Sequence, residues 1–152
     1  MRTRIYMSFL SCFTIWGCTE SSKLKLAPQT IFEKENLQVI MSGFNKRKNT
    51  STILYGNSIG GNFGANKIKS LVPGQIFKLV TWGQKPNPYW FGGNINDGIL
   101  TIETVKISGE ENGYVFTEYL AKNNKGDIIH KNNAERLATI KLISDRKPSA
   151  FP

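Results

Sequence analysis

The chain contains very little cysteine and histidine, with two cysteines and one histidine among 152 residues. Both cysteines, Cys12 and Cys18, lie close to the N-terminus. The chain after Cys18 therefore has no internal disulfide, no zinc site built from thiolates and no cysteine nucleophile. The only histidine is His130, which excludes sites that need two or three imidazoles, and any Ser-His-Asp arrangement would have to use it.

The N-terminus also lacks a hydrophobic run long enough to cross a bilayer. A helix over residues 5–16 would be about 18 Å long, whereas a hydrocarbon core is roughly 30 Å thick. Arg2 and Arg4 precede this short apolar run and Gly17-Cys18 follow it, an arrangement typical of a secretory signal. Ile15-Trp16-Gly17-Cys18 resembles the bacterial lipobox, in which Leu-Ala-Gly-Cys is usual. The resemblance implies a lipoprotein signal peptide over residues 1–17 and a lipid on Cys18. An ordinary signal cut elsewhere is the alternative.

Composition predicts one domain behind a polar tether. Residues 18–29 are polar, contain Pro28 and show no sustained periodicity, so we expect a tether there. Residues 30–152 are enough for one compact domain. The net charge of +9 would suit nucleic acid, but an exported chain rarely meets it and the basic residues are scattered. The local exception, Lys46-Arg47-Lys48, is either a solvated turn or a contact with anionic lipid headgroups.

Alternation of apolar and polar residues predicts an antiparallel meander followed by one helix. The expected strands are residues 37–43, 52–55, 75–82, 99–107 and 114–120. Asn96-Asp97-Gly98 is a turn signal, and residues 108–113 suggest a long hairpin loop. Asn132, with Glu135 three residues later, predicts a capped terminal helix that ends before Pro148. Its apolar side would consist of Ala134, Leu137, Ala138, Ile140 and Ile143.

Two charged residues interrupt apolar rows on the predicted strands. Strand alternation places Ile76, Lys78, Val80 and Trp82 on one face. In the next strand it places Ile99, Thr101, Glu103, Val105 and Ile107 on one face. A charge on a buried face must be paired, neutralised or used. Lys78 and Glu103 are therefore candidate site residues, unless their rows face solvent or the two residues only pair with each other.

Aromatic residues gather between the third and fourth predicted strands, where Trp82, Tyr89, Trp90 and Phe91 are followed by two glycines. Such a group could line an apolar pocket that a ligand approaches closely. It could equally form part of the core. The pocket hypothesis places Lys78 and Glu103 at the polar end of the same cavity.

Several strings of residues resemble the single-domain branch of the cytochrome P-460 family. They are Ile53-Leu54-Tyr55-Gly56-Asn57, Pro73-Gly74, Leu79-Val80-Thr81-Trp82, Pro88-Tyr89-Trp90-Phe91-Gly92, Ile102-Glu103 and Asn112-Gly113-Tyr114. The resemblance implies a mainly antiparallel β-domain flanked by helices. Haem-bearing members oxidise hydroxylamine or handle nitric oxide, and attach haem through a C-terminal Cys-x-x-Cys-His. Residues 127–152 contain no cysteine, so covalent haem is excluded. Lys78 lies one position away from the register of the family's haem-linked lysine, so that role is not transferred.

The expected protein is a lipid-anchored α+β domain that faces the periplasm, with the outer membrane favoured by Thr19. Cys18 would hold it to the membrane, and we expect it to bind a small apolar or aromatic ligand, or a partner, without a cofactor or metal. Its expected ligand-binding residues are Trp82, Tyr89, Trp90, Phe91, Lys78 and Glu103. One alternative is an enzyme with noncovalent haem on His130, acting on hydroxylamine or nitric oxide. The other is a structural or interaction lipoprotein that has no pocket.

Overall fold

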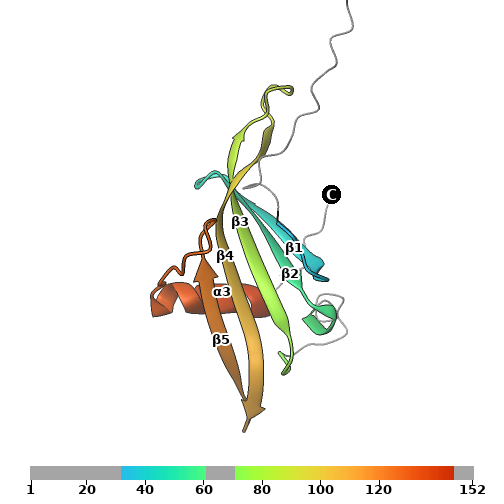
Figure 1. Ribbon diagram of the computed structural model, residues 1–152, viewed down its shortest axis with the longest axis vertical. Helices are drawn as coiled ribbons and strands as arrows, with labels where there is room; N and C mark the ends of the chain where they lie inside the picture. The colour runs from blue at the N-terminus through green and yellow to red at the C-terminus, as the bar shows by residue number, and fades with distance from the viewer. Residues whose placement is uncertain (1–31, 61–70, 146–152) are drawn as a thin grey trace, which may run out of the picture.

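The structure, a computed structural model, describes residues 32–60 and 71–145. In this part of the chain five strands form one antiparallel sheet in the order β1-β2-β3-β4-β5 (Figure 1). The elements are β1 (Gln38–Asn45), β2 (Thr50–Gly56), β3 (Ile76–Pro86), β4 (Asn94–Glu111), β5 (Tyr114–Lys122) and helix α3 (Asn133–Ser144). The predicted signal peptide (residues 1–17) and the tether (residues 18–29), which begins with Cys18, lie outside the described residues.

The sheet confirms the predicted sheet-dominated α+β class and the antiparallel meander. Each of the five predicted strands is present, and most are longer than expected. The predicted turn at Asn96-Asp97-Gly98 is wrong, because these residues lie inside β4 and Asn96 pairs with Gln84. The second hairpin is also tighter than predicted. Asn112 and Gly113 alone separate β4 from β5, both with positive φ, as a two-residue hairpin turn requires.

Apolar side chains cover both faces of the sheet. On one face α3 crosses the strands (Figure 1), and Ile143 packs with Leu54, Phe77 and Val105. On the other face Leu37, which follows the N-terminal turn, packs with Tyr55, Val80, Trp82 and Ile99. The central strands are therefore buried from two sides, which explains the near-continuous apolar run in β3.

Helix α3 begins where the sequence predicts. The Asn132 side chain accepts a hydrogen bond from Glu135 N at 2.9 Å, and the Glu135 carboxylate accepts one from Asn132 N at 3.0 Å. This reciprocal capping box satisfies two backbone donors at the start of the helix. The helix ends at Ser144, with Asp145 as its C-cap, before Pro148. Its predicted apolar side is only partly correct, since Ile143 is buried while Leu137 is 64% exposed.

A β-hairpin projects from each end of the sheet. The β3–β4 hairpin projects at the upper end in Figure 1, and the β4–β5 hairpin projects at the lower end. Within residues 32–60 and 71–145, no helix is long and apolar enough to span a membrane.

Candidate functional site

Lys78 and Glu103 lie on opposite faces of the sheet, so they neither pair nor share a cavity. Lys78 pairs in register with Thr104, whereas Glu103 pairs with Leu79. Because alternate residues of a strand point to opposite faces, Glu103 faces α3 and Lys78 faces the other way. The predicted polar end of a common pocket is therefore wrong.

A β-bulge explains why simple alternation failed in β4. Thr81 pairs with Thr101, but the next residue, Trp82, pairs with Ile99, so Leu100 is an extra residue in β4. One extra residue moves every position beyond it to the other face. Ile99 therefore packs with Trp82 on the face opposite Glu103, and the predicted single row from Ile99 to Ile107 does not form.

The Glu103 carboxylate is buried, 4% exposed, and accepts hydrogen bonds from three side-chain donors. It accepts hydrogen bonds from Lys131 Nζ at 2.6 Å, Tyr119 OH at 2.5 Å and Thr139 Oγ1 at 2.7 Å. Burial alone raises the pKa of Glu103, but these hydrogen bonds and the Lys131 charge outweigh it, so the net pKa lies below 4.5. Burial and the bond to Glu103 raise the pKa of the Tyr119 hydroxyl. This cluster joins α3 and the segment before it to the sheet, and both oxygens of Glu103 accept hydrogen bonds within it.

The predicted aromatic group does not form a single cluster. Trp82 is 3% exposed and lies in the core, whereas Tyr89, Trp90 and Phe91 are 74%, 73% and 104% exposed at the tip of the β3–β4 hairpin. The pocket that these four residues were expected to line is therefore absent from the described structure. Strand β3 continues to Pro86 before the chain turns, which carries the tip residues away from the core.

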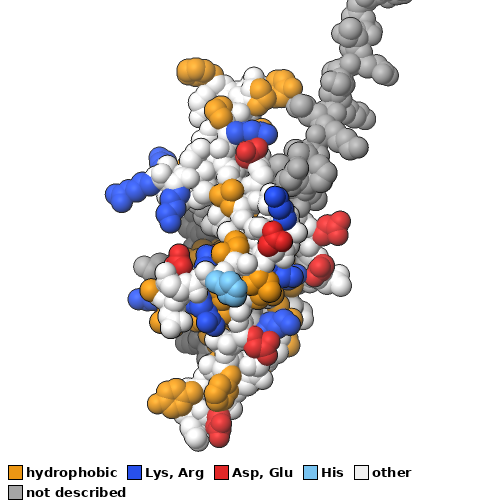
Figure 2. Space-filling view, turned by 60° about the vertical axis from the view of Figure 1, so that its left-hand side comes forward, with side chains coloured by type: hydrophobic (Ala, Val, Ile, Leu, Met, Phe, Trp, Pro, Cys, Tyr) orange, Lys and Arg blue, Asp and Glu red, His pale blue; other side chains and the backbone are white. Residues whose placement is uncertain are grey.

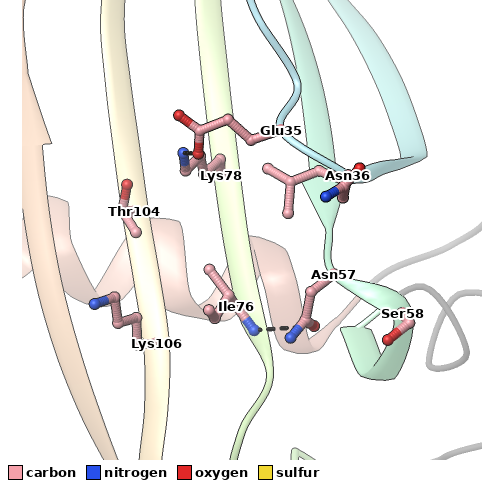
Figure 3. Close-up of a pocket in the computed structure, with 9 residues that line it drawn as sticks. Glu35, Asn36, Asn57, Ser58, Ile76, Lys78, Thr104 and Lys106 are labelled. Carbon is pink, nitrogen blue, oxygen red and sulfur yellow. Dashed lines mark hydrogen bonds and ion pairs between the residues drawn. The ribbon is translucent and has the colours of Figure 1, made fainter.

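A cleft with a volume of about 560 Å³ lies on the face opposite α3. Figure 3 shows Lys78 and Ile76 from β3 and Thr104 and Lys106 from β4 on one side. The turn that contains Glu35 and the segment after β2 that contains Ser58 enclose it from the other side. The volume lies within the roughly 300–1,000 Å³ range of small-molecule sites.

Two lysines set the electrostatics of this cleft. In the strand register Lys78 lies opposite Thr104 and Lys106 lies opposite Ile76, so the two lysines are diagonal neighbours, about 7–8 Å apart at the backbone. Lys78 Nζ donates to Glu35 Oε2 at 2.9 Å and lies 5.9 Å from the centre of the Phe32 ring. Glu35 is 71% exposed, and its bond to Lys78 holds its pKa below the usual value. Within the described residues, Lys106 has no ion-pair partner.

The turn that carries Glu35 has an unusual backbone. Glu35 and Asn36 both have positive φ, 42° and 62°, which non-glycine residues rarely adopt. Leu37 N donates to Lys34 O at 2.7 Å, and the buried Leu37 side chain anchors the turn to the sheet. The chain thus holds a carboxylate over Lys78 at some conformational cost, a feature that often marks functional sites.

Asn57 fixes the lower wall of the cleft. Its Oδ1 accepts from Gly60 N at 2.9 Å and Ile76 N at 3.2 Å, and its Nδ2 donates to Gly74 O at 2.9 Å. These bonds tie the end of β2 to the start of β3, so Asn57 positions the wall. The hydroxyls of Ser58 and Thr104 are further neutral polar groups of the cleft.

This cleft contains a motif that the sequence expectations did not include. Residues 56–60 read Gly-Asn-Ser-Ile-Gly, the spacing of a nucleophile elbow, and residues 58–60 are helical after strand β2. Ser58 does not have the positive φ of a strained elbow, and His130 does not line this cleft. The motif therefore forms a strand-to-helix turn without a catalytic triad.

His130 is exposed beside a different, smaller hollow of about 210 Å³, lined also by Tyr119, Lys131 and Arg136. This volume is below the usual range for small-molecule sites, so these residues do not fit a haem group. In the part of the chain that the structure describes, histidine and acidic residues form no cluster suited to a metal ion.

Neither protein-family models nor curated proteins match this chain. The key residues of the cleft other than Lys78 were missed because Glu35, Ser58 and Lys106 come from separate segments. The alternation of Thr104 and Lys106 with buried residues was the one available sequence signal.

Proposed function

We propose that the protein is a cell-envelope domain that binds a small anionic ligand in the cleft between Lys78 and Lys106, without covalent haem. The observation that carries this proposal is the pair of diagonal lysines, of which one is held by the exposed Glu35 carboxylate and the other has no ion-pair partner among the described residues. Carboxylate and phosphate groups are the usual partners of such ammonium groups. A polar ligand replaces the apolar one expected from the aromatic residues.

In this proposal the anionic ligand displaces the Glu35 carboxylate from Lys78. An oxygen of the ligand takes the place of Glu35 Oε2 on Lys78, and a second oxygen takes a hydrogen bond from Lys106. The Ser58 and Thr104 hydroxyls line the same cleft and can donate to further oxygens. Because Glu35 is largely exposed, its carboxylate returns to water at little cost when the ligand displaces it.

Titration calorimetry of the full chain in detergent tests the cleft, with inorganic phosphate and succinate as separate probes. Lys78→Gln and Lys106→Gln should each weaken binding by about 10- to 100-fold, the usual range for a lost hydrogen bond to a charged group. Glu35→Gln should tighten binding, because it removes the competing carboxylate. Lys122→Gln, an exposed lysine on β5, is the matched control and should change nothing.

Two results would contradict the proposal. One is that neither phosphate nor succinate binds, which would favour a structural or interaction lipoprotein. The other is weaker binding of phosphate or succinate in Glu35→Gln, which would mean that Glu35 holds Lys78 in position and does not compete with the ligand.

The envelope location is a second part of the proposal and rests on Cys18 after a short apolar run. Cys18→Ser should release the protein from membranes or leave it unprocessed. Membrane fractionation and the N-terminal mass report the outcome. Unchanged fractionation with an unchanged mass would remove the lipid anchor from the proposal and leave the cleft untouched. The resemblance to the cytochrome P-460 family supports a haem-free relative of that fold.

A further inference from the structure

The tip of the β3–β4 hairpin is a well-formed turn that holds three aromatic side chains in solvent. Asn87 N donates to Gly93 O at 2.8 Å, and Gly93 N donates to Trp90 O at 3.1 Å. The Asn87 side chain accepts from Tyr89 N at 2.9 Å, and Gly92 has a φ of 78°, which favours glycine. The backbone is therefore fixed by hydrogen bonds, although the side chains it presents have no core to pack against.

The exposure of this tip is unusual for a soluble surface. Tyr89, Trp90 and Phe91 are consecutive, and each is at least 73% exposed. Single exposed apolar residues need no explanation, but a contiguous group marks an interaction site. Tyrosine and tryptophan are the residues that collect at membrane–water interfaces, because their rings are apolar and their polar groups remain hydrated.

A basic loop lies beside the base of this hairpin. The β1–β2 turn contains Lys46-Arg47-Lys48, and its last residue, Asn49, is joined to β3 by two hydrogen bonds. Gln84 N donates to Asn49 O at 3.0 Å, and Asn49 Nδ2 donates to Gln84 O at 3.0 Å. Within the described residues, none of the three basic side chains has an ion-pair partner. Lys85, near the end of β3, is paired with Asp97 at 3.0 Å.

The opposite end of the sheet provides an internal comparison. Tyr114 and Phe116 are 76% and 52% exposed at the β4–β5 hairpin, but Glu110, Glu111 and Glu118 surround them in sequence. Figure 2 shows apolar side chains at both ends of the molecule, with several basic groups and one acidic group below the upper end and an acidic group at the lower end. Two aromatic ends therefore differ in the sign of the neighbouring charge, and only the upper one complements an anionic surface.

We propose that the β3–β4 tip inserts Tyr89, Trp90 and Phe91 into the interface of an anionic lipid bilayer, with Lys46-Arg47-Lys48 bound to its headgroups. A narrow convex tip suits a deformable lipid surface, and each basic residue near such a surface adds to the attraction. This contact is independent of the anion-binding cleft and orients the domain on the membrane.

Fluorescence of Trp90 tests the insertion directly. The full chain is reconstituted into vesicles of phosphatidylcholine, or of phosphatidylcholine with phosphatidylglycerol, both carrying brominated acyl chains as quenchers. Trp90 should be quenched and blue-shifted in the anionic vesicles. Trp90→Phe, which leaves the buried Trp82, measures the background from the remaining tryptophans.

Matched charge variants identify the contribution of the basic loop. Changing Lys46, Arg47 and Lys48 together to Gln should reduce quenching to the level seen in phosphatidylcholine. Changing Lys122, Lys125 and Lys141 to Gln removes the same charge elsewhere and should leave quenching unchanged. The variant with Gln at positions 46–48 should still bind phosphate in the cleft. The membrane contact and the anion-binding cleft can therefore be disproved independently.

Two outcomes would overturn the membrane contact. The first is equal quenching of Trp90 in both vesicle types, or no quenching above the Trp90→Phe background. A blue shift that grows with protein concentration without vesicles, and disappears in Glu110→Gln with Glu111→Gln, assigns the tip to the acidic end of a second copy instead.

Discussion

Glu103 illustrates at the scale of one residue how a buried charge is accommodated. Glu103→Gln should lower the free energy of unfolding by about 3 kcal/mol, because Lys131, itself only 21% exposed, loses its charged partner. Since the pKa of Glu103 is lower in the folded protein than in the unfolded chain, its contribution to stability is complete above about pH 4.5 and is lost as pH falls through the folded value. Urea unfolding at several acidic pH values measures both the loss of stability in Glu103→Gln and the pH dependence of stability. Glu35→Gln, the exposed counterpart, should show little change; equal losses in the two variants would contradict the assigned burial.

The tryptophans provide a second prediction at this scale. Trp82 is buried between β2 and β4, so Trp82→Ala should lower the unfolding free energy by about 3–5 kcal/mol. Trp90→Ala removes an exposed ring and should change stability by less than about 0.5 kcal/mol. Thermal melts of the two variants separate these cases. A large loss in Trp90→Ala would place the hairpin tip in the core, as one reading of the sequence allowed.

At the scale of an element, the cap of α3 makes a contribution to stability that is separate from its short buried face. Its buried residues are only Thr139 and Ile143, and Arg136 lies 5.3 Å from the centre of the Tyr119 ring on the sheet. Asn132→Ala should therefore cost about 1 kcal/mol through the lost cap. Asn133→Ala, one position later, is the control and should be nearly neutral. Circular dichroism and chemical unfolding report the result, and similar losses in both variants would argue against the capping box as its source.

At the scale of the whole molecule, stability should be greatest in the middle of the sheet and lowest at its ends. Leu79 and Val80 in β3 are 6% and 0% exposed, with core on both faces of the strand. Their amide hydrogens should exchange only with global unfolding, whereas those of residues 87–93 should exchange through local opening. Hydrogen exchange by mass spectrometry measures this difference. Protection of residues 87–93 on anionic vesicles alone would also support the membrane contact.

Local patterns in the sequence determined where the elements lie. Alternation located the five strands, short connections implied their antiparallel order, and Asn132 with Glu135 marked the start of α3, because these features depend on neighbouring residues. Tertiary structure decided the sites. The extra residue at Leu100 reversed which face Ile99 occupies, and Lys131 reached Glu103 from another segment. The cleft likewise joins Glu35, Lys78 and Lys106 across the fold. Such contacts depend on strand register and on residues distant in sequence, and a one-residue bulge is enough to redirect a side chain from one face of the sheet to the other.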